Sequence, residues 1–210
     1  MNKIGVFGGT FNPVHKGHEI TAVGFYNKFE LNKLIIIPAN IPPHKSISEK
    51  VTAKQRLEMC EICFEKYRRE YNYNIEVSDI EIKKDGLSYT YDTVKTLREI
   101  YPGDAIYFLA GSDMFLYLKH WRRYKELLEI CVFAVAFRNG KDMAEVFELR
   151  GELINQGYKI DLLENSPFEI SSTELREKIK NFGVDSTDLD KYISPEVVNY
   201  IKERKIYVLQ

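Results

Sequence analysis

The stretch from Met1 to His18 constrains the fold of this chain more than any other part. A short apolar run, Ile4 to Phe7, ends on Gly8-Gly9, and a loop interrupted by Pro13 leads to two histidines. This order predicts a strand, a tight turn and the start of a helix. Glycines after a strand let backbone N–H groups approach a ligand, and unsatisfied N–H groups at a helix start favour an anion. The chain is therefore predicted to open with a phosphate-binding turn.

The next residues complete a βαβ unit. Between His18 and Phe29 the apolar and aromatic residues have largely helical spacing, and Lys33 to Pro38 is a continuous apolar run ended by proline, which is typical of a strand covered on both faces. A proline-rich loop with His44 and Lys45 follows at the carboxyl end of this second strand. Ligands of open α/β sheets bind at such ends, so we expect this loop to face the same crevice as the first turn.

Strands and helices alternate along the rest of the chain. Thr52 and Gln55 predict a capping box that starts a helix running to about Tyr67, and the alternation from Asn74 to Lys83 predicts one bent strand or two short ones. The further predicted elements are a helix from 88–92 to Ile100, a strand at 105–110, a short helix carrying Trp121, a strand at 131–137, a helix at 143–155, a strand at 158–163, and helices beginning at Ser171 and Ser194.

This alternation predicts the α/β class, with a Rossmann-like, doubly wound, mostly parallel sheet and helices on both faces. With 210 residues the chain is long enough for one well-buried core. We therefore expect a single domain over residues 1–210, in which the C-terminal helical part covers about 171–205.

Composition argues against several classes of function. The chain carries 30 basic and 31 acidic residues, a balance that disfavours a general affinity for nucleic acid or anionic membranes. No apolar run has the length of a signal peptide core or a membrane span, so we expect a cytoplasmic protein. Cys60 and Cys63 have metal or redox spacing, but no second cysteine pair or nearby histidine completes a site, and we interpret them, like Cys131, as free thiols.

Two places in the sequence have the chemistry of a phosphate site. His15 and His18 are three residues apart at a helix start, so both imidazoles are expected on one face, where they can donate to a phosphoryl group and a leaving pyrophosphate. The alternative is that one caps the helix and the other packs. Near the other end of the chain, Ser172, Thr173 and Arg176 supply hydroxyls and a guanidinium suited to a triphosphate, although Ser171 with Glu174 is also an ordinary capping box.

These two segments carry a resemblance. The stretch from Gly8 to His18 resembles the signature of the nucleotidyltransferase superfamily, with Asn12 where many members have Asp, and Ile170 to Arg176 is similar to its Ile-Ser-Ser-Thr-x-x-Arg pattern. The resemblance implies that the two motifs converge on one nucleotide, although they lie far apart in the sequence.

Three more segments narrow the resemblance to the bacterial nicotinate-nucleotide adenylyltransferase family: Pro38 to Lys45, Ser88 to Asp92, and Gly111 to Trp121. The similarity runs over nearly the whole chain. It implies transfer of AMP from ATP to nicotinate mononucleotide, giving nicotinate adenine dinucleotide and pyrophosphate in NAD biosynthesis. The implied partners are these two small molecules, with Mg²⁺ carried mainly by the nucleotide and no metal site built from side chains.

The same resemblance implies a set of site residues. Trp121 would stack on the pyridine ring, a flat heteroaromatic cation that suits an indole face, and Thr90 would meet its carboxylate. The implied catalytic residues are His15, His18 and Arg176; those for ATP are Gly8, Gly9, Thr10, Phe11, Gly111, Asp113, Arg138, Ser172 and Thr173; and those for the mononucleotide are Asn40, His44, Lys45, Thr90 and Trp121.

Alternatives remain open from the residues themselves. Trp121 would serve equally well to pack its segment onto the sheet, and Lys45 is also compatible with a solvated loop charge. At the level of the whole chain, one alternative is a sister adenylyltransferase or cytidylyltransferase that uses another phosphorylated acceptor, such as pantetheine phosphate. Another is a nucleotide-binding module without turnover.

Overall fold

The computed structural model describes residues 1–43, 51–84, 86–137, 143–164, 170–184, 186 and 188–207. Six strands form one parallel sheet in the order β3-β2-β1-β4-β5-β6. The strands are β1 (Lys3–Gly9), β2 (Lys33–Pro38), β3 (Ile75–Val77), β4 (Ala105–Gly111), β5 (Val132–Phe137) and β6 (Ile160–Glu164). Because the strand order reverses between β1 and β4, the sheet is doubly wound with a switch point there. The predicted α/β class is confirmed, and the sheet is parallel throughout.

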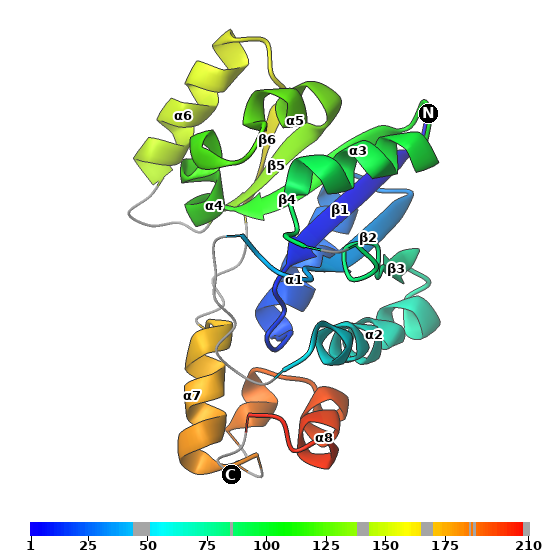
Figure 1. Cartoon of the computed structure of the whole chain (residues 1–210), viewed down its shortest axis with the longest axis vertical. Helices are drawn as coiled ribbons and strands as arrows, with labels where there is room; N and C mark the ends of the chain where they lie inside the picture. The colour runs from blue at the N-terminus through cyan, green and yellow to red at the C-terminus, as the bar shows by residue number, and fades with distance from the viewer. Residues whose placement is uncertain are drawn as a thin grey trace. The chain divides into compact units, whose positions relative to one another are not determined.

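Helices alternate with these strands (Figure 1). They are α1 (Lys16–Lys28), α2 (Ala53–Glu70), α3 (Thr90–Ile100), α4 (Ser112–Leu116), α5 (Tyr124–Ile130), α6 (Met143–Asn155), α7 (Ser172–Phe182) and α8 (Pro195–Glu203), with 3₁₀ turns η1 (Leu118–His120) and η2 (Leu189–Lys191). Among the described helices, none is long and apolar enough to cross a membrane.

Residue contacts group the chain into two compact units that alternate along the sequence. The first unit comprises Met1–Gly8, Thr21–Ile35 and Ser88–Pro167, and the second comprises Gly9–Ile20, Ile36–Leu87 and Phe168–Gln210. That residues 1–210 form a single domain stays a prediction.

The core of the first unit lies on the strands. Val6 of β1 is in register with Phe108 of β4, and Phe108 is in register with Phe133 of β5. These three side chains are buried, which is why the strands read as continuous apolar runs. At Gly5 a Cβ would stand 2.3 Å from a methyl carbon of Leu31, so this glycine allows close packing against β1. Figure 1 shows α3 running along this part of the sheet, where it contacts β4.

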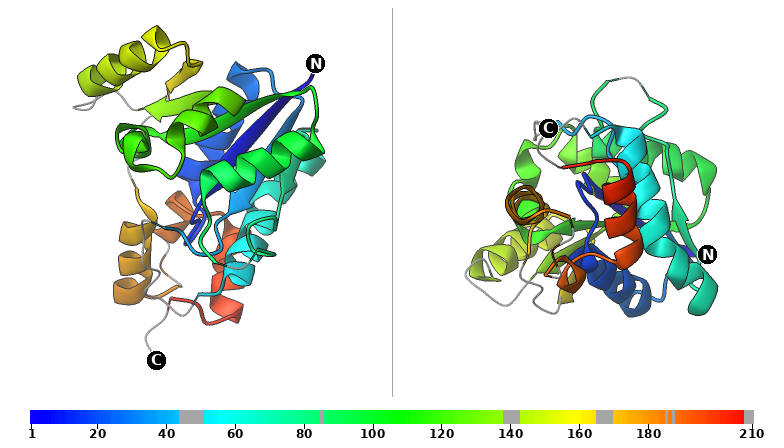
Figure 2. Two further views of the ribbon diagram at one scale, coloured as in Figure 1. Left: turned by 45° about the horizontal axis from the view of Figure 1, so that its top comes forward. Right: turned by 90° about the horizontal axis from the view of Figure 1, so that it is seen from below.

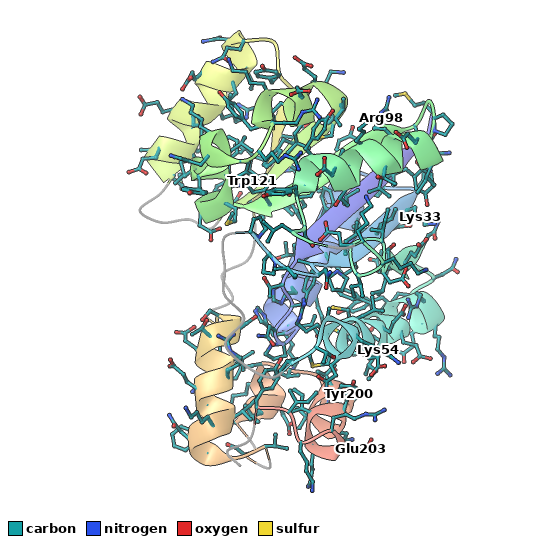
Figure 3. The ribbon with its side chains drawn as sticks, in the orientation of Figure 1. Lys33, Lys54, Arg98, Trp121, Tyr200 and Glu203 are labelled. Atoms are coloured by element: carbon teal, nitrogen blue, oxygen red, sulfur yellow. The ribbon has the colours of Figure 1, made fainter. Side chains whose placement is uncertain are left out.

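Helix packing dominates the second unit. Thr52 and Gln55 form the predicted capping box at the start of α2, with the Gln55 N–H donating to Thr52 Oγ1 at 3.1 Å. Figure 2 shows α8 alongside α2, and the hydroxyl of Tyr200, labelled in Figure 3, donates to Glu58 across this contact. Ser171 and Ser194 are the N-caps of α7 and α8, as predicted.

Local predictions were wrong at two places. Residues 80–83 form a turn rather than a strand, because backbone bonds such as Lys83 N–H to Asp79 O, 2.9 Å, close the chain on itself. Trp121 does not lie in a helix: it follows η1, and a separate helix, α5, begins after a left-handed residue, Arg123, with φ 57°. By contrast, α1 begins at Lys16, between the two histidines that were predicted to mark the helix start.

Candidate active site

The glycine-rich turn is shaped by an aromatic ring. Phe11 is 1% exposed and has a left-handed backbone with φ 48°. A Cβ at Gly9 would lie 2.9 Å from this ring, so only glycine fits there. At Gly8 a Cβ would make only ordinary van der Waals contact, at 3.7 Å from the Phe108 ring, so packing within the protein would allow a larger residue at this position. The side chain of Phe11 therefore supports the turn from inside, and only its backbone is suited to touch a ligand.

The two histidines lie side by side, as predicted. His15 is the residue before α1 and is 6% exposed, whereas His18 is half-buried. Their ring centroids are 3.7 Å apart, and the His18 ring also lies edge-on to Phe11 at 5.0 Å. The backbone N–H of His15 donates to Nδ1 of His18 at 3.2 Å. Because Nδ1 is an acceptor, the neutral His18 imidazole carries its proton on Nε2, and that nitrogen is the donor suited to a phosphate oxygen.

The start of α1 is less open than the sequence suggested. The Lys16 N–H donates to the carbonyl oxygen of Tyr192 at 2.7 Å, and the His18 N–H donates to that of His15 at 2.8 Å. Two of the first-turn backbone N–H groups, which have no acceptor one turn earlier in the helix, thus donate to other carbonyls of the protein. The phosphate-binding capacity of this turn therefore depends more on the histidine side chains than on the helix N-terminus.

The two sequence motifs are in direct contact. Ser172 Oγ donates to the carbonyl oxygen of Pro13 at 3.0 Å, and Arg176 Nη1 donates to that of Asn12 at 2.9 Å. Arg176 Nη2 also donates to Thr173 Oγ1 at 3.3 Å. The first turn of α7 is thereby held against the loop that precedes the histidines. The two motifs therefore lie against each other in the second unit, and their convergence on one nucleotide stays a prediction.

A tyrosine near the C-terminus also supports this loop. Asn12 is buried, and its Oδ1 accepts a hydrogen bond from the hydroxyl of Tyr207. No pattern in the sequence pointed to Tyr207 or to Tyr192 as partners of the loop. Both contacts join residues that are remote in the chain, and only the folded structure brings them together.

A buried ionic cluster anchors the first turn of α1 to α2, and sequence reasoning missed it. Glu19 is 2% exposed, its Oε2 lies 2.6 Å from Lys66 Nζ, and it accepts from the Tyr67 hydroxyl at 2.9 Å. Burial and the charge of Glu19 together raise the pKa of Tyr67, which keeps this phenol protonated as a donor. The cluster follows His18 directly and so contributes to holding the histidines in place.

The loop after β2 is only partly described. Asn40 Nδ2 donates to the carbonyl oxygen of Lys84 at 3.1 Å, which braces the loop. The predicted site residues His44, Lys45 and Arg138 lie outside the described residues.

Thr90 and Trp121 belong to segments that meet in the first unit. Thr90 is the first residue of α3, and Asp92 in the same turn pairs with Arg122 at 2.9 Å. The Arg122 guanidinium also lies 4.7 Å from the ring centre of Tyr89, a cation–π contact. The residue next to Trp121 therefore ties this segment to the start of α3, where Thr90 lies.

Trp121, labelled in Figure 3, is half-buried, and its ring packs edge-on against two core aromatics. Its ring centroid lies 6.1 Å from that of Phe108 and 6.0 Å from that of Phe133. Its buried indole Nε1 has no hydrogen-bond partner within the described part of the chain. This environment matches the packing interpretation, and the part of the side chain left accessible still allows a stacked ligand. Stacking on a pyridine ring stays a prediction.

Gly111 and Asp113 stand together at the end of β4. A Cβ at Gly111 would lie 2.8 Å from Asp113 Oδ1, so glycine gives the carboxylate its room, and Asp113 is exposed. Within the described ranges, no group of three or more His, Cys, Asp or Glu residues could hold a metal ion.

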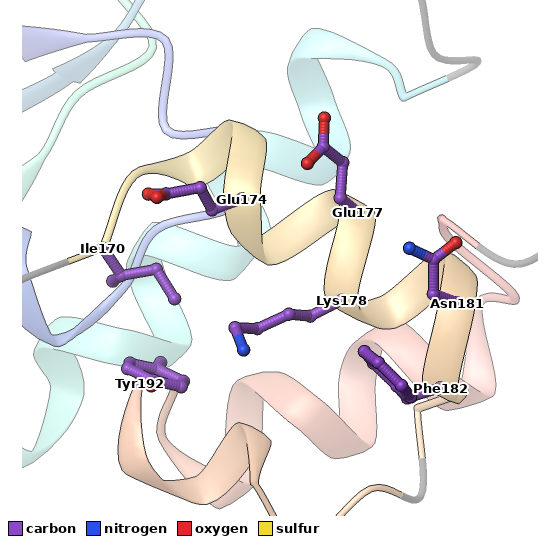
Figure 4. A pocket seen from close by; sticks show the side chains of 7 residues that line it. All are labelled: Ile170, Glu174, Glu177, Lys178, Asn181, Phe182 and Tyr192. Atoms are coloured by element: carbon purple, nitrogen blue, oxygen red, sulfur yellow. The ribbon is translucent and has the colours of Figure 1, made fainter.

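A cavity of about 230 Å³ lies beside α7 (Figure 4). Figure 4 shows Lys178 reaching from this helix toward Tyr192, with Nζ 5.6 Å from the ring centre. The lining residues are Ile170, Glu174, Glu177, Lys178, Asn181, Phe182 and Tyr192. None of them is a predicted site residue, so this cavity is not the predicted nucleotide site.

Comparison with known families agrees with the fold and the paired motifs. The cytidylyltransferase-like family model matches residues 6–178. The chain is thus a nucleotidyltransferase of the cytidylyltransferase-like class. It has the doubly wound parallel sheet, together with a Gly-Gly turn, two histidines and a Ser-Ser-Thr-x-x-Arg helix start.

Full-length relatives narrow the class. A Fusobacterium nucleatum protein named "probable nicotinate-nucleotide adenylyltransferase" is 40% identical, with 97% of this chain and 99% of the relative covered. A protein of the same name from Geobacillus kaustophilus is 35% identical, with 99% and 87% covered. The chain belongs to the nicotinate-nucleotide adenylyltransferase family.

Solved structures support the fold independently. Plasmodium falciparum nicotinic acid mononucleotide adenylyltransferase, solved in complex with NaAD, superposes with a TM-score of 0.81 at 23% identity, covering 99% of this chain and 98% of that one. A Vibrio parahaemolyticus protein gives a TM-score of 0.65 at 19% identity, covering 99% and 96%. At these identities the likeness concerns the fold.

Proposed function

We propose that the protein transfers AMP from ATP to nicotinate mononucleotide, producing nicotinate adenine dinucleotide and pyrophosphate. The observation that carries this proposal is the contact between the two nucleotidyltransferase motifs, through Ser172 to Pro13 and Arg176 to Asn12, beside the paired histidines. Family membership supports the identity of the acceptor.

The reaction needs no nucleophilic side chain. An oxygen of the acceptor 5′-phosphate, already an anion, attacks the α-phosphorus of ATP, and the bond to the bridging oxygen of pyrophosphate breaks. Catalysis then consists of positioning and of stabilising negative charge on the α-phosphoryl group and the leaving pyrophosphate. His15, His18 and Arg176 are the side chains proposed for this role, because they supply imidazole and guanidinium donors around one loop.

The remaining ATP contacts are proposed on chemistry and family pattern. Gly8, Gly9 and Thr10 offer backbone donors close to a phosphate, and Ser172 and Thr173 offer hydroxyls at the start of α7. Arg176 is partly engaged with Asn12 and Thr173 in the protein, so its fork is oriented before a nucleotide arrives. Such orientation reduces the entropy lost on binding.

The mononucleotide contacts are proposed for Asn40, His44, Lys45, Thr90 and Trp121. Support for Thr90 and Trp121 comes from the Asp92–Arg122 pair, which ties their two segments together in the first unit. The Mg²⁺ ion would neutralise charge on the triphosphate, and we propose that the nucleotide supplies most of its ligands. A cytoplasmic location stays a prediction.

One assay separates this proposal from its alternatives. Pyrophosphate release is measured with ATP and each of three acceptors: nicotinate mononucleotide, the corresponding amide, and pantetheine phosphate. We expect the highest kcat/KM with nicotinate mononucleotide. Preference for pantetheine phosphate would point to a sister transferase, and ATP binding without pyrophosphate release from any acceptor would point to a binding module.

A further inference from the structure

Arg56 of α2 is a fully buried arginine that joins two loops of the predicted site. Its side chain is 1% exposed, with Nη1 donating to the carbonyl oxygen of Thr10 at 2.8 Å and Nη2 to that of Asn40 at 3.0 Å. Thr10 belongs to the glycine-rich turn after β1, and Asn40 belongs to the loop after β2. A single planar fork therefore holds both loops.

A backbone bond reinforces the same junction. The Ala39 N–H donates to the carbonyl oxygen of Gly9 at 2.9 Å, next to the two carbonyls that Arg56 holds. The separation of Thr10 from Asn40 is thus set by three hydrogen bonds, of which two depend on one side chain. In-line transfer requires the two phosphates to meet within a few tenths of an ångström of the productive geometry, and Thr10 and Asn40 are predicted to bind one substrate each.

The buried charge of Arg56 is met by one carboxylate at longer range, since the charge of Glu81 acts to raise the pKa of the guanidinium. Within the described part of the chain Arg56 forms no ion pair, and its Nε has no hydrogen-bond partner. Burial lowers the pKa of the guanidinium, which still remains a cation at neutral pH because arginine is effectively always protonated in proteins. A buried cation without an ion pair is unfavourable in the free protein. An anion bound at the Thr10 and Asn40 loops would compensate for it.

We propose that Arg56 is a positioning residue that sets the distance between the ATP loop and the acceptor loop, and that its buried charge favours phosphate bound at them. This inference rests on the function proposed above. Because Arg56 is 1% exposed and its Nη1 and Nη2 donate to the Thr10 and Asn40 carbonyls, we infer that it acts through these two loops.

Two substitutions separate the geometric part from the electrostatic part. Arg56→Lys keeps the charge but loses the planar fork that spans two carbonyls, and Arg56→Met removes both charge and donors. Arg69→Met on the same helix is the matched control, since the Arg69 side chain is 76% exposed and, among the described residues, its ion pair is with Glu65 on the surface. All proteins are assayed at a temperature at which thermal unfolding curves show them to be fully folded.

For Arg56→Lys we expect kcat to fall at least about tenfold, while KM for both substrates and the calorimetric Kd for ATP stay within about threefold of wild type. For Arg56→Met we expect kcat to fall roughly 10²-fold and ATP to bind about tenfold more weakly. The Arg69→Met protein should match wild type. A folded Arg56→Lys protein with wild-type kcat would overturn the proposal, since a purely structural role lowers the melting temperature without changing turnover of the folded enzyme.

The readouts also keep the two proposals apart. If the wild-type protein transfers AMP to no acceptor, the proposed function fails, and the ATP titrations still test Arg56. Equal ATP affinity for wild type and a folded Arg56→Met protein would then refute the electrostatic part. If Arg56→Met does not fold, kcat and ATP affinity of Arg56→Lys decide the geometric part.

Discussion

His18 shows how one side chain combines a local structural bond with a chemical role. Its Nδ1 accepts a hydrogen bond from the backbone N–H of His15, as the side chain of the third helical residue does in a capping box. Because Nδ1 is the acceptor, the proton of the neutral ring is on Nε2. The donor proposed for the phosphoryl group is therefore defined by a bond on the opposite side of the ring.

His18→Ala is expected to lower kcat by about 10²- to 10³-fold, the usual cost of losing one transition-state donor. The melting temperature should fall only slightly, because one backbone N–H loses its partner. Steady-state kinetics and thermal unfolding measure both effects. His120→Ala is the control, since His120 is exposed, stacks on Tyr117 with ring centroids 4.3 Å apart and has no proposed role of its own. Near-wild-type turnover of folded His18→Ala would remove His18 from the mechanism.

At the scale of one element, α7 illustrates a helix start that serves stability and chemistry together. The Glu174 N–H donates to Ser171 Oγ at 3.2 Å, and Glu174 Oε2 accepts the Ser171 N–H at 2.7 Å. Ser172 and Arg176, which follow Ser171 in the helix, contact the loop that precedes the histidines. Fraying of this turn would therefore disturb the proposed ATP site directly.

Ser171→Ala should lower the free energy of unfolding by about 1 kcal/mol, the typical effect of losing an N-cap side chain, and should raise KM for ATP. Ser194→Ala is a matched control, because Ser194 is also an N-cap but its side chain makes no capping bond. Its unfolding free energy should stay within about 0.5 kcal/mol of wild type. Urea denaturation compares the two, and equal losses would contradict this account of the capping box.

At the scale of the whole molecule, the buried thiols link stability to alkaline pH. Cys60, Cys63 and Cys131 are free and buried, and burial raises the pKa of Cys131 to about 12 from its ordinary 9.0. A group whose pKa is higher in the folded than in the unfolded state contributes its full stability below the unfolded value. That contribution is lost as the pH rises from 9 toward 12, because only the unfolded thiol ionises.

Urea unfolding at pH 8 and pH 10 tests this linkage. Each such thiol lowers the free energy of unfolding by roughly 1.4 kcal/mol for every pH unit above its pKa in the unfolded state. Between pH 8 and pH 10 the free energy of unfolding should therefore fall by about 1 kcal/mol more in the wild-type protein than in Cys131→Ala. Because each protein is compared with itself at two pH values, the stability that the substitution removes through lost packing cancels. An identical pH dependence in both proteins would show that Cys131 does not contribute.

The sequence by itself determined the strands, most helices and the chemistry of both motifs. Strands such as Lys33–Pro38 are buried on both faces and so read as unbroken apolar runs, while the capping boxes at Thr52 and Ser171 are local patterns that need no tertiary contact. The turn at 80–83 and the place of Trp121 outside a helix were mispredicted, because short apolar segments take their form from the core they pack against.

Only the tertiary structure decided which distant residues support the site. In the sequence, Arg56 is one of several charged residues in a predicted helix, yet in the structure it donates to the Thr10 and Asn40 carbonyls. Tyr207 lies after the last predicted helix, and its hydroxyl donates to the Asn12 side chain. The reason is physical: every residue has a backbone carbonyl and many have a polar side chain, so the sequence of a loop does not indicate which distant donor will bind it. Local periodicity and capping specify elements, and the folded chain alone specifies which buried donor meets which carbonyl.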